Sequence, residues 1–324
     1  MSSSVSAATS PAPDADVSTV PLRIRGLGKR YGAEQVLDGL DLEVTANSIH
    51  GLVGLNGSGK TTTLECILGM RQFDSGQVEV LGLSPAKLHQ ARGAVVGIFD
   101  TPSLHPGLTV RQSLEHARLI CDRPVRSCAE VERLLGIVSY SDYRIRHLSL
   151  GNKRRASIAQ ALIGDPRLII LDEPFNGLDA EGVNDVLALI ARLNREQGTA
   201  FLLSSHQLPY LEQICSHLAI LHNGKIAVND SIDKLFSRDH ARIQVSCDRP
   251  ADAAGLINSS ALARVESIQD NRLLCELLEG NAASLNSLLV SQGYAVSELL
   301  EKQDSLSSLF YQITAETDGQ TETG

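Results

Sequence analysis

The chain has 324 residues, of which 43% are hydrophobic and 21% are charged, so it can bury a sizeable core and general disorder is excluded. Its formal net charge of -9 argues against a nucleic-acid-binding protein, because such proteins normally carry a basic surface. The six cysteines are scattered without a CxxC pair or a His/Cys metal spacing, which favours reduced thiols in a cytosolic protein over a zinc site or a disulfide framework.

The two ends of the sequence have the composition of tails. Residues 1–20 are rich in Ser, Ala, Pro and Asp, lack the basic and apolar regions of a secretion signal, and are predicted to be disordered. Residues 317–324 are predicted to be a second disordered tail. No apolar run approaches the roughly 18 residues that a membrane-spanning helix needs. We therefore expect a cytoplasmic protein whose membrane function, if any, depends on a partner.

From residue 22 to residue 206, strand-like and helix-like segments alternate. We expect strands at 22–31, 36–44, 48–55, 167–174 and 199–206, and helices at 61–70, 110–120, 153–164 and 181–198. This alternation predicts a largely parallel, buried sheet with helices on its faces.

The composition changes near residue 237. Beyond it we expect strands at 241–248, 263–270, 272–279 and 295–301, and helices at 250–260, 282–293 and 305–314. The βαββαβ order predicts a small α+β, ferredoxin-like appendage over residues 237–316. Because it has no glycine-rich loop and no acidic cluster, we expect a structural or docking role for it.

A glycine-rich segment joins the strand at 48–55 to the helix at 61–70, and it matches GxxxxGK[ST] at every fixed position. Glycines let successive backbone N–H groups turn toward phosphate oxygens, and the helix adds its positive N-terminal end. Lys60 is expected to reach the β- and γ-phosphates of ATP, and Thr61 to bind Mg²⁺. The alternative is a chance turn, which the strand–loop–helix context disfavours. The residues predicted to hold the nucleotide here are Gly54, Leu55, Asn56, Gly57, Ser58, Gly59, Lys60, Thr61 and Thr62.

Two adjacent acids, Asp172 and Glu173, stand at the end of the apolar strand expected at 167–174. A strand buried on both faces can carry acids only at its end, where a cation or a cleft satisfies them. Asp172 is predicted to join the Mg²⁺ shell and Glu173 to polarise an attacking water. The alternative is a strand that runs into a solvated turn, and these residues alone do not decide between the two.

The segment from Leu148 to Arg155 reads LSLGN followed by basic residues. Here the chain resembles the ATP-binding-cassette (ABC) family, whose signature motif is LSGGQ followed by basic residues. Leu150 replaces the middle glycine and Asn152 replaces the glutamine. The resemblance implies that Ser149 and Gly151 contact the γ-phosphate of ATP held by a second subunit. A capped surface helix is the alternative for this segment taken alone.

Three further segments match the family in order. Tyr31 stands where the family stacks an aromatic ring on adenine, Asn176 to Asp179 resemble the D-loop that couples two sites, and His206 resembles the switch histidine at the γ-phosphate. The alternatives are local packing for Tyr31, an ordinary turn capped by Asp179, and a structural histidine.

One position departs from the family, which usually has a glutamine between its main lobe and its helical lobe. We expect Asp100 at that position, although a shift of register could put Thr101 there. A carboxylate can bind Mg²⁺ as an amide oxygen does, so Asp100 is predicted as a third metal-site residue. A solvated turn acid is the alternative.

The resemblance runs from about residue 22 to residue 235, and it implies an α/β P-loop NTPase cassette over residues 21–236. Such a cassette has a mixed sheet core and a helical lobe, here expected at about 101–165. The implied cofactors are ATP and Mg²⁺, and the implied catalytic residues are Lys60, Glu173 and His206. The implied partners are a second copy, in a dimer that sandwiches two ATP, and a separate multi-helix permease on the inner face of the cell membrane.

The LSLG signature and the appendage resemble drug, bacteriocin and antibiotic-resistance exporters with a separate permease. We therefore expect an exporter ATPase that binds no nucleic acid and never touches the transported substrate. Two alternatives remain, a non-transport ABC ATPase and the ATPase of an importer. The first would bring a long coiled-coil insertion, a second cassette or a basic surface, none of which is visible in the sequence.

Overall fold

The computed structural model describes residues 20–101, 103–236, 241–269, 271–302, 306–311 and 313. The tail predicted at 317–324 and all but the last residue of the tail predicted at 1–20 lie outside these residues. The chain divides into two compact units, Met1–Ile232 and Asp233–Gly324, which are described separately.

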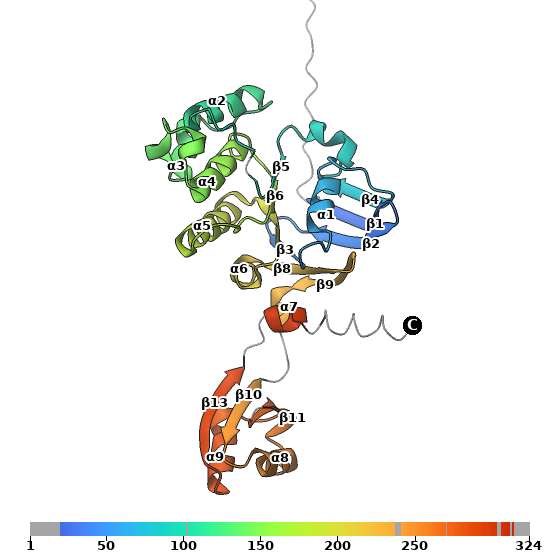
Figure 1. Ribbon diagram of the computed structural model, residues 1–324, viewed down its shortest axis with the longest axis vertical. Helices are drawn as coiled ribbons and strands as arrows, with labels where there is room; N and C mark the ends of the chain where they lie inside the picture. The colour runs from blue at the N-terminus through green and yellow to red at the C-terminus, as the bar shows by residue number, and fades with distance from the viewer. Residues whose placement is uncertain are drawn as a thin grey trace, which may run out of the picture. The chain divides into compact units, whose positions relative to one another are not determined.

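The first unit contains two sheets (Figure 1). A three-stranded antiparallel sheet has the order β2-β1-β4. A six-stranded sheet has the order β5-β6-β7-β3-β8-β9 and is parallel except for β9, which pairs antiparallel with β8. The strands are β1 (Leu22–Tyr31), β2 (Glu34–Val44), β3 (Ile49–Val53), β4 (Ser75–Val80), β5 (Val95–Ile98), β6 (Leu168–Asp172), β7 (Ala200–Ser205), β8 (His217–His222) and β9 (Lys225–Ser231).

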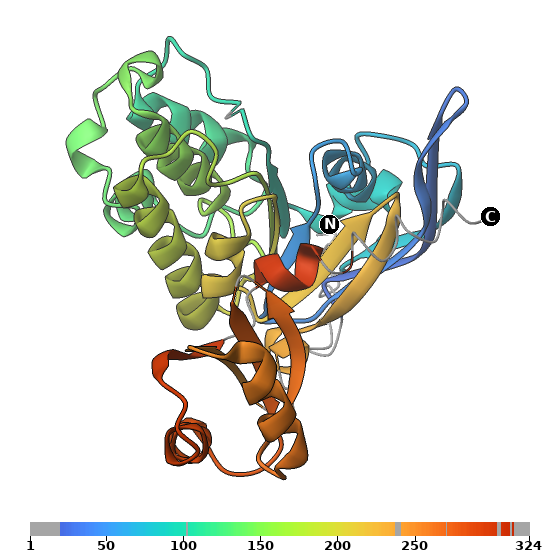
Figure 2. The same ribbon diagram turned by 60° about the horizontal axis from the view of Figure 1, so that its bottom comes forward.

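Helices cover both faces of the six-stranded sheet. In both ribbon views, α1 lies on one side of this sheet and α4, α5 and α6 lie on the other (Figures 1 and 2). Every residue of β3, β6 and β7 is buried, as expected for parallel strands covered on both faces. The helices are α1 (Lys60–Ile67), α2 (Val110–Ile120), α3 (Cys128–Leu134), α4 (Leu150–Ala161), α5 (Ala180–Gln197) and α6 (Leu208–Ile214). A short helix, α7 (Ile232–Phe236), begins at the last residue of this unit and continues into the second.

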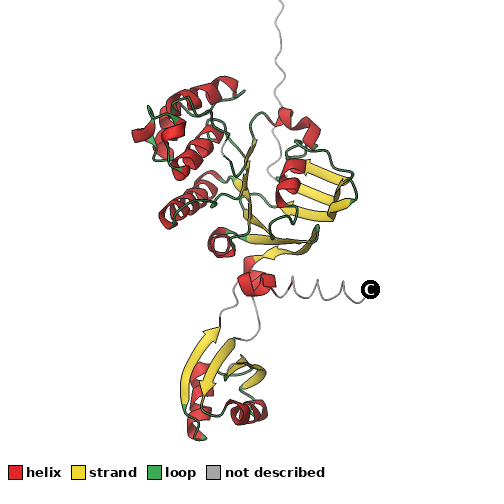
Figure 3. Cartoon of the chain, in the orientation of Figure 1, coloured by secondary structure: helices red, strands yellow, loops and turns green. Residues whose placement is uncertain are grey.

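The described part of the second unit includes a four-stranded antiparallel sheet with two helices packed on it (Figure 3). Its strand order, β11-β12-β10-β13, is that of a ferredoxin-like βαββαβ fold. Alternate residues of β10, including Ile243 and Val245, are buried against Ile257 of one helix and Leu285 of the other, so both helices pack on one face. The elements are β10 (Arg242–Cys247), α8 (Pro250–Ser259), β11 (Ala263–Gln269), β12 (Arg272–Leu277), α9 (Ala282–Ser291) and β13 (Val296–Lys302).

The fold class predicted from the sequence is confirmed: the first unit has a mixed sheet with a helical lobe, and the second is α+β. Four strands, β4, β5, β8 and β9, were not predicted from the sequence. All six cysteines are unpaired, and Cys121 alone among them is not buried. No helix in the described part of the chain is long and apolar enough to cross a membrane.

His50, on β3, makes the stability of the first unit sensitive to acid. Its ring is 2% exposed and stacks on that of His217, with centroids 4.6 Å apart and planes 3° from parallel. Burial, and then the charge of His217, lower the pKa of His50 from 6.5 to about 3. As pH falls below 6.5, His50 is protonated in the unfolded chain but stays neutral in the folded chain. The free energy of unfolding therefore decreases, and it continues to decrease down to about pH 3.

We expect the free energy of unfolding to fall by up to about 1.4 kcal/mol per pH unit in this window, from His50 alone. Urea titrations of the parental chain and of His50→Gln at pH 7 and pH 5 measure this loss of stability. Glutamine is chosen because it can still accept the hydrogen bond that the Thr45 N–H donates to His50 Nε2 (3.3 Å). Equal pH dependence in the two chains would contradict the prediction.

Candidate functional site

The glycine-rich loop connects the carboxyl end of β3 to α1. A Cβ atom at Gly54 would lie 2.4 Å from Ser58 Oγ and 2.7 Å from the carbonyl oxygen of Leu221, so only glycine fits there. Gly59, the N-cap of α1, has a φ of 104°, which side chains rarely allow. These two glycines let the loop fold back so that Lys60 begins the helix.

Lys60 is 6% exposed and lies under the loop. Its Nζ donates to the carbonyl oxygens of Gly54 (2.8 Å) and Leu55 (3.2 Å), and lies 3.5 Å from Glu173 Oε1. A cavity of about 400 Å³ opens beside it and brings together residues from three of the predicted motifs. The lining residues are Val36, Asn56, Gly57, Gly59, Lys60, Thr61, Thr62, Asp100, Asp172 and Glu173.

Asp172 ends β6 at the floor of this cavity and is 4% exposed. Thr61 Oγ1 donates to its Oδ2 at 3.0 Å, and Ser204 Oγ donates to its Oδ1. Ser204 is the partner of Asp172 in the register of β6 and β7, so strand pairing places the Ser204 hydroxyl beside the Asp172 carboxylate. Ser204 was not among the residues predicted from the sequence.

Glu173, the next residue, is 9% exposed and has a φ of 45°, an uncommon left-handed conformation for a residue with a side chain. Its Oε1 lies 3.0 Å from His206 Nδ1, and its Oε2 accepts a hydrogen bond from Ser205 Oγ (3.1 Å). The carboxylate thus lies among Lys60, Ser205 and His206. The structure therefore brings together the three residues predicted to be catalytic, and adds Ser205.

Asp100 follows β5, and its side chain is 51% exposed at the edge of the cavity. Among the described residues that line the cavity, Asp100 is present and Thr101 is not. Asp100 Oδ1 lies 3.7 Å from Nη2 of Arg154, a fully buried residue of α4 that the sequence analysis passed over. The role of Asp100 as a metal-site residue stays a prediction.

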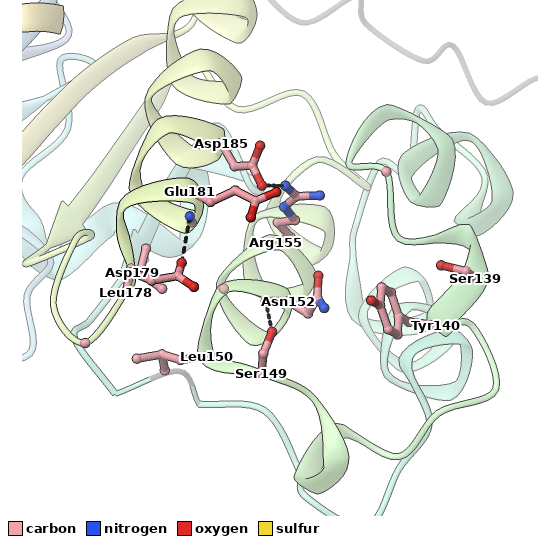
Figure 4. A pocket seen from close by; sticks show the side chains of 14 residues that line it. Ser139, Tyr140, Ser149, Leu150, Asn152, Arg155, Leu178, Asp179, Glu181 and Asp185 are labelled. Carbon is pink, nitrogen blue, oxygen red and sulfur yellow. Dashed lines mark hydrogen bonds and ion pairs between the residues drawn. The ribbon is translucent and has the colours of Figure 1, made fainter.

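Ser149 and Gly151 line a different cavity, of about 520 Å³, and do not meet Lys60 within the chain. Ser149 is the N-cap of α4 and accepts a hydrogen bond from the N–H of Asn152 (3.3 Å). In Figure 4, Ser149 and Asn152 lie between Tyr140 on one side and Leu178 and Asp179 on the other. The signature segment therefore faces a polar hollow that is lined in part by Gly177, Leu178 and Asp179, from the segment that resembles the D-loop.

Leu150, which replaces a glycine of the family motif, contacts this D-loop. A Cβ added to Gly177, at a φ of 70°, would lie 2.7 Å from Leu150 Cδ2, so the leucine side chain packs directly on the glycine. Asp179 caps α5 by accepting a hydrogen bond from the N–H of Gly182 (2.9 Å), as the ordinary-turn alternative also requires. The packing shows how leucine is accommodated in the signature.

Tyr31 ends β1 and is 39% exposed. Lys29 Nζ lies 5.3 Å and Arg71 Cζ lies 5.5 Å from the centroid of its ring, within the range of cation–π contacts. Tyr31 does not line the cavity beside Lys60. Its stacking on adenine stays a prediction.

The oxygen donors beside Lys60 fit Mg²⁺. The Thr61 hydroxyl and the Asp172 carboxylate are hard oxygen ligands that already meet at 3.0 Å. No cluster of three or more His, Cys, Asp or Glu side chains that could hold a metal occurs among the described residues. A protein site for Mg²⁺ needs only one or two carboxylates when substrate phosphates and water complete the shell, so this small donor set is sufficient.

The chain was compared with known proteins, and a family model described as ABC transporter matches residues 37–176. The bacitracin transport ATP-binding protein BcrA of Bacillus licheniformis is 31% identical over 300 residues, which cover 92% of this chain and 98% of that protein. The Nod factor export ATP-binding protein I of Ralstonia nicotianae is 32% identical over 238 residues, which cover 71% of this chain and 72% of that protein.

Among solved structures, one described as an ATP binding subunit of an ABC transporter matches with a TM-score of 0.61 at 29% identity. The match covers 67% of this chain and 92% of that one. The similarity to both BcrA and the solved structure therefore extends over nearly the whole of those proteins.

Proposed function

Because the chain belongs to the ABC transporter family of ATP-binding proteins, we propose that it powers export through a separate membrane permease. Membership of the family makes the chain an ATP-binding ATPase, which confirms the resemblance inferred from the motifs. The observation that carries the proposal is the contact of Glu173 with both Lys60 and His206 beside the Thr61–Asp172 pair.

The arrangement supports a simple division of roles in hydrolysis. The Lys60 ammonium and the N–H groups of the glycine-rich loop bind the phosphates and offset their charge. Glu173 accepts a hydrogen bond from the attacking water, and His206 orients both the carboxylate and the γ-phosphate. When Mg²⁺ is bound with ATP, held by Thr61 and Asp172, it supplies positive charge that stabilises the transferring phosphoryl group.

A complete site requires a second copy of the chain. Ser149 and Gly151 lie in a cavity of their own, at the N-terminus of α4, whose positive end suits the γ-phosphate of ATP bound by a partner. We therefore propose a head-to-tail dimer that sandwiches two ATP molecules. Binding of ATP closes it and hydrolysis opens it, a population shift driven by the γ-phosphate contacts.

The helical lobe next to Asp100 is the surface we propose for permease docking. Two of the relatives carry transport or export in their names, one for bacitracin and one for Nod factor, which supports transport over a non-transport ATPase and export over import. We accordingly propose that the protein lies at the inner face of the membrane through its permease and does not contact the cargo.

Affinity purification of the tagged chain from detergent-solubilised membranes tests this proposal. We expect recovery of a multi-helix permease, together with ATP hydrolysis that a divalent-cation chelator abolishes. An untagged strain is the control for adventitious membrane proteins. Consistent recovery of the chain without any permease would overturn the transport function, and recovery of an extracellular solute-binding protein as well would make the system an importer.

A further inference from the structure

Arg154 is a buried cation behind the candidate active site. It lies in the second turn of α4 and is 0% exposed. Burial lowers its pKa below the usual value, while Asp100 and Asp172 act in the opposite direction. A buried charge persists only where hydrogen bonds and opposite charges compensate for the lost water. The contacts of Arg154 therefore indicate which parts of the chain it stabilises.

Two of those contacts are backbone carbonyls at the ends of adjacent strands. Nη1 donates to the carbonyl oxygen of Phe99 at 2.9 Å, and Nη2 donates to that of Glu173 at 3.3 Å. Phe99 follows β5 and Glu173 follows β6, and these strands are neighbours in the sheet. The guanidinium thus ties the helix of the signature motif to both strand ends.

The third contact is the ion pair between Nη2 and Asp100 Oδ1 at 3.7 Å. Nε of Arg154 is buried without a hydrogen-bond partner in the described part of the chain, so the contacts of the guanidinium are those of Nη1 and Nη2. The acid that replaces the family glutamine therefore meets a buried cation within its own chain.

We propose that Arg154 is a positioning residue that links Asp100 to Glu173. The guanidinium holds the Glu173 carbonyl, and with it the left-handed backbone that directs the carboxylate toward Lys60 and His206. It also offsets the negative charge of Asp100, so that an acid can occupy the glutamine position beside the phosphates. A movement of the Asp100 loop is then transmitted through Arg154 to the carboxylate that polarises water. This inference rests on the proposed function.

Kinetics of the purified full-length chain test the link. Arg154→Gln is expected to lower kcat for ATP about 10- to 100-fold and to change KM less than about 2-fold, because Lys60 and the glycine-rich loop still bind the phosphates. Arg154→Lys keeps the charge but cannot reach both carbonyls, and we expect it to recover part of the rate. The control is Arg23→Gln, which breaks an exposed pair with Glu43 (3.0 Å) and should leave both constants unchanged.

A double-variant comparison separates positioning from a merely structural role. Asp100→Asn alone is expected to lower kcat about 3- to 10-fold, and in the Arg154→Gln background to cause little further loss, because the link is already broken. Losses that simply multiply in the double variant would overturn the proposal. So would a parental kcat in Arg154→Gln.

Thermal unfolding and the affinity for a fluorescent ATP analogue are measured on every variant. If Arg154→Gln does not fold, the test uses Arg154→Lys and Asp100→Asn, the second at a half-exposed side chain. A parental kcat in both of these variants would overturn the proposal. A parental chain without ATP hydrolysis would contradict the proposed function itself. If the parental chain hydrolyses ATP and these variants do so at the same rate, the proposed function stands and the link from Asp100 to Glu173 is contradicted.

Discussion

Replacing Lys60 by methionine is expected to reduce the rate of ATP hydrolysis at least about 100-fold, equivalent to about 2.7 kcal/mol. Methionine keeps the unbranched stem but removes the only positive charge that the glycine-rich segment contributes to the cavity. Lys60 Nζ now bridges the Gly54 and Leu55 carbonyls and faces Glu173, so it is placed to exchange these contacts for phosphate oxygens. Charge-assisted contacts to phosphate in a buried site are among the strongest that a side chain can make.

The loss should appear in binding as well as in turnover, since phosphate contacts form before the chemical step. Titration with a fluorescent ATP analogue measures the first, and release of inorganic phosphate measures the second. Lys225→Met is the matched control, because Lys225 forms an exposed pair with Asp38 (3.0 Å). Lys60→Met binding the nucleotide with parental affinity and hydrolysing it at the parental rate would contradict the assigned role.

The motif residues could be proposed from the sequence because their chemistry is local. A glycine-rich turn, a lysine and a threonine adjacent in the chain can be identified without knowing the fold, and the same holds for two acids after an apolar strand. The structure confirms that Lys60, Thr61, Asp172 and Glu173 share one cavity. The functional roles of these residues remain predictions that the variants test.

Two of the residues that were not predicted, Ser204 and Ser205, are brought to the site by the sheet. Ser204 and Ser205 reach the acids because β6 and β7 are parallel neighbours in register, which pairs Asp172 with Ser204. Ser204 and Ser205 could have been predicted only if the strand order had been known. Arg154 carried a signal of its own, since it shares a helix face with Ile158 and Ala161, all three buried, and a cation on such a face needs a partner.

Three of the four strands that were missed, β4, β5 and β9, have weak local patterns. β4 mixes exposed and buried residues in a short span, β9 has only exposed and half-buried residues, and the four residues of β5 are mostly half-buried. Their pairing with β1, β8 and β6 makes them strands, and such long-range pairing cannot be inferred from a short window. The βαββαβ appendage was easier because its strands alternate and its order is distinctive.

Glu173→Gln is expected to lower kcat for ATP about 100- to 1000-fold while ATP still binds, because an amide cannot take the proton of the attacking water. The substitution preserves the shape of the side chain, and its carbonyl oxygen can still accept the hydrogen bond from Ser205 Oγ. It removes the negative charge 3.5 Å from Lys60 Nζ, which leaves the ammonium free for phosphate. ATP binding should therefore be as tight as in the parental chain or tighter.

A variant that binds ATP but does not hydrolyse it should accumulate as the closed dimer. Size-exclusion chromatography with Mg²⁺ and ATP is expected to show the Glu173→Gln dimer, which disappears when ADP replaces ATP. Glu43→Gln, on the exposed pair with Arg23, should behave as the parental chain does. Hydrolysis by Glu173→Gln at the parental rate would remove Glu173 from its role. A slow variant that stays monomeric with ATP would leave that role intact and instead contradict the dimer that Ser149 and Gly151 are proposed to complete.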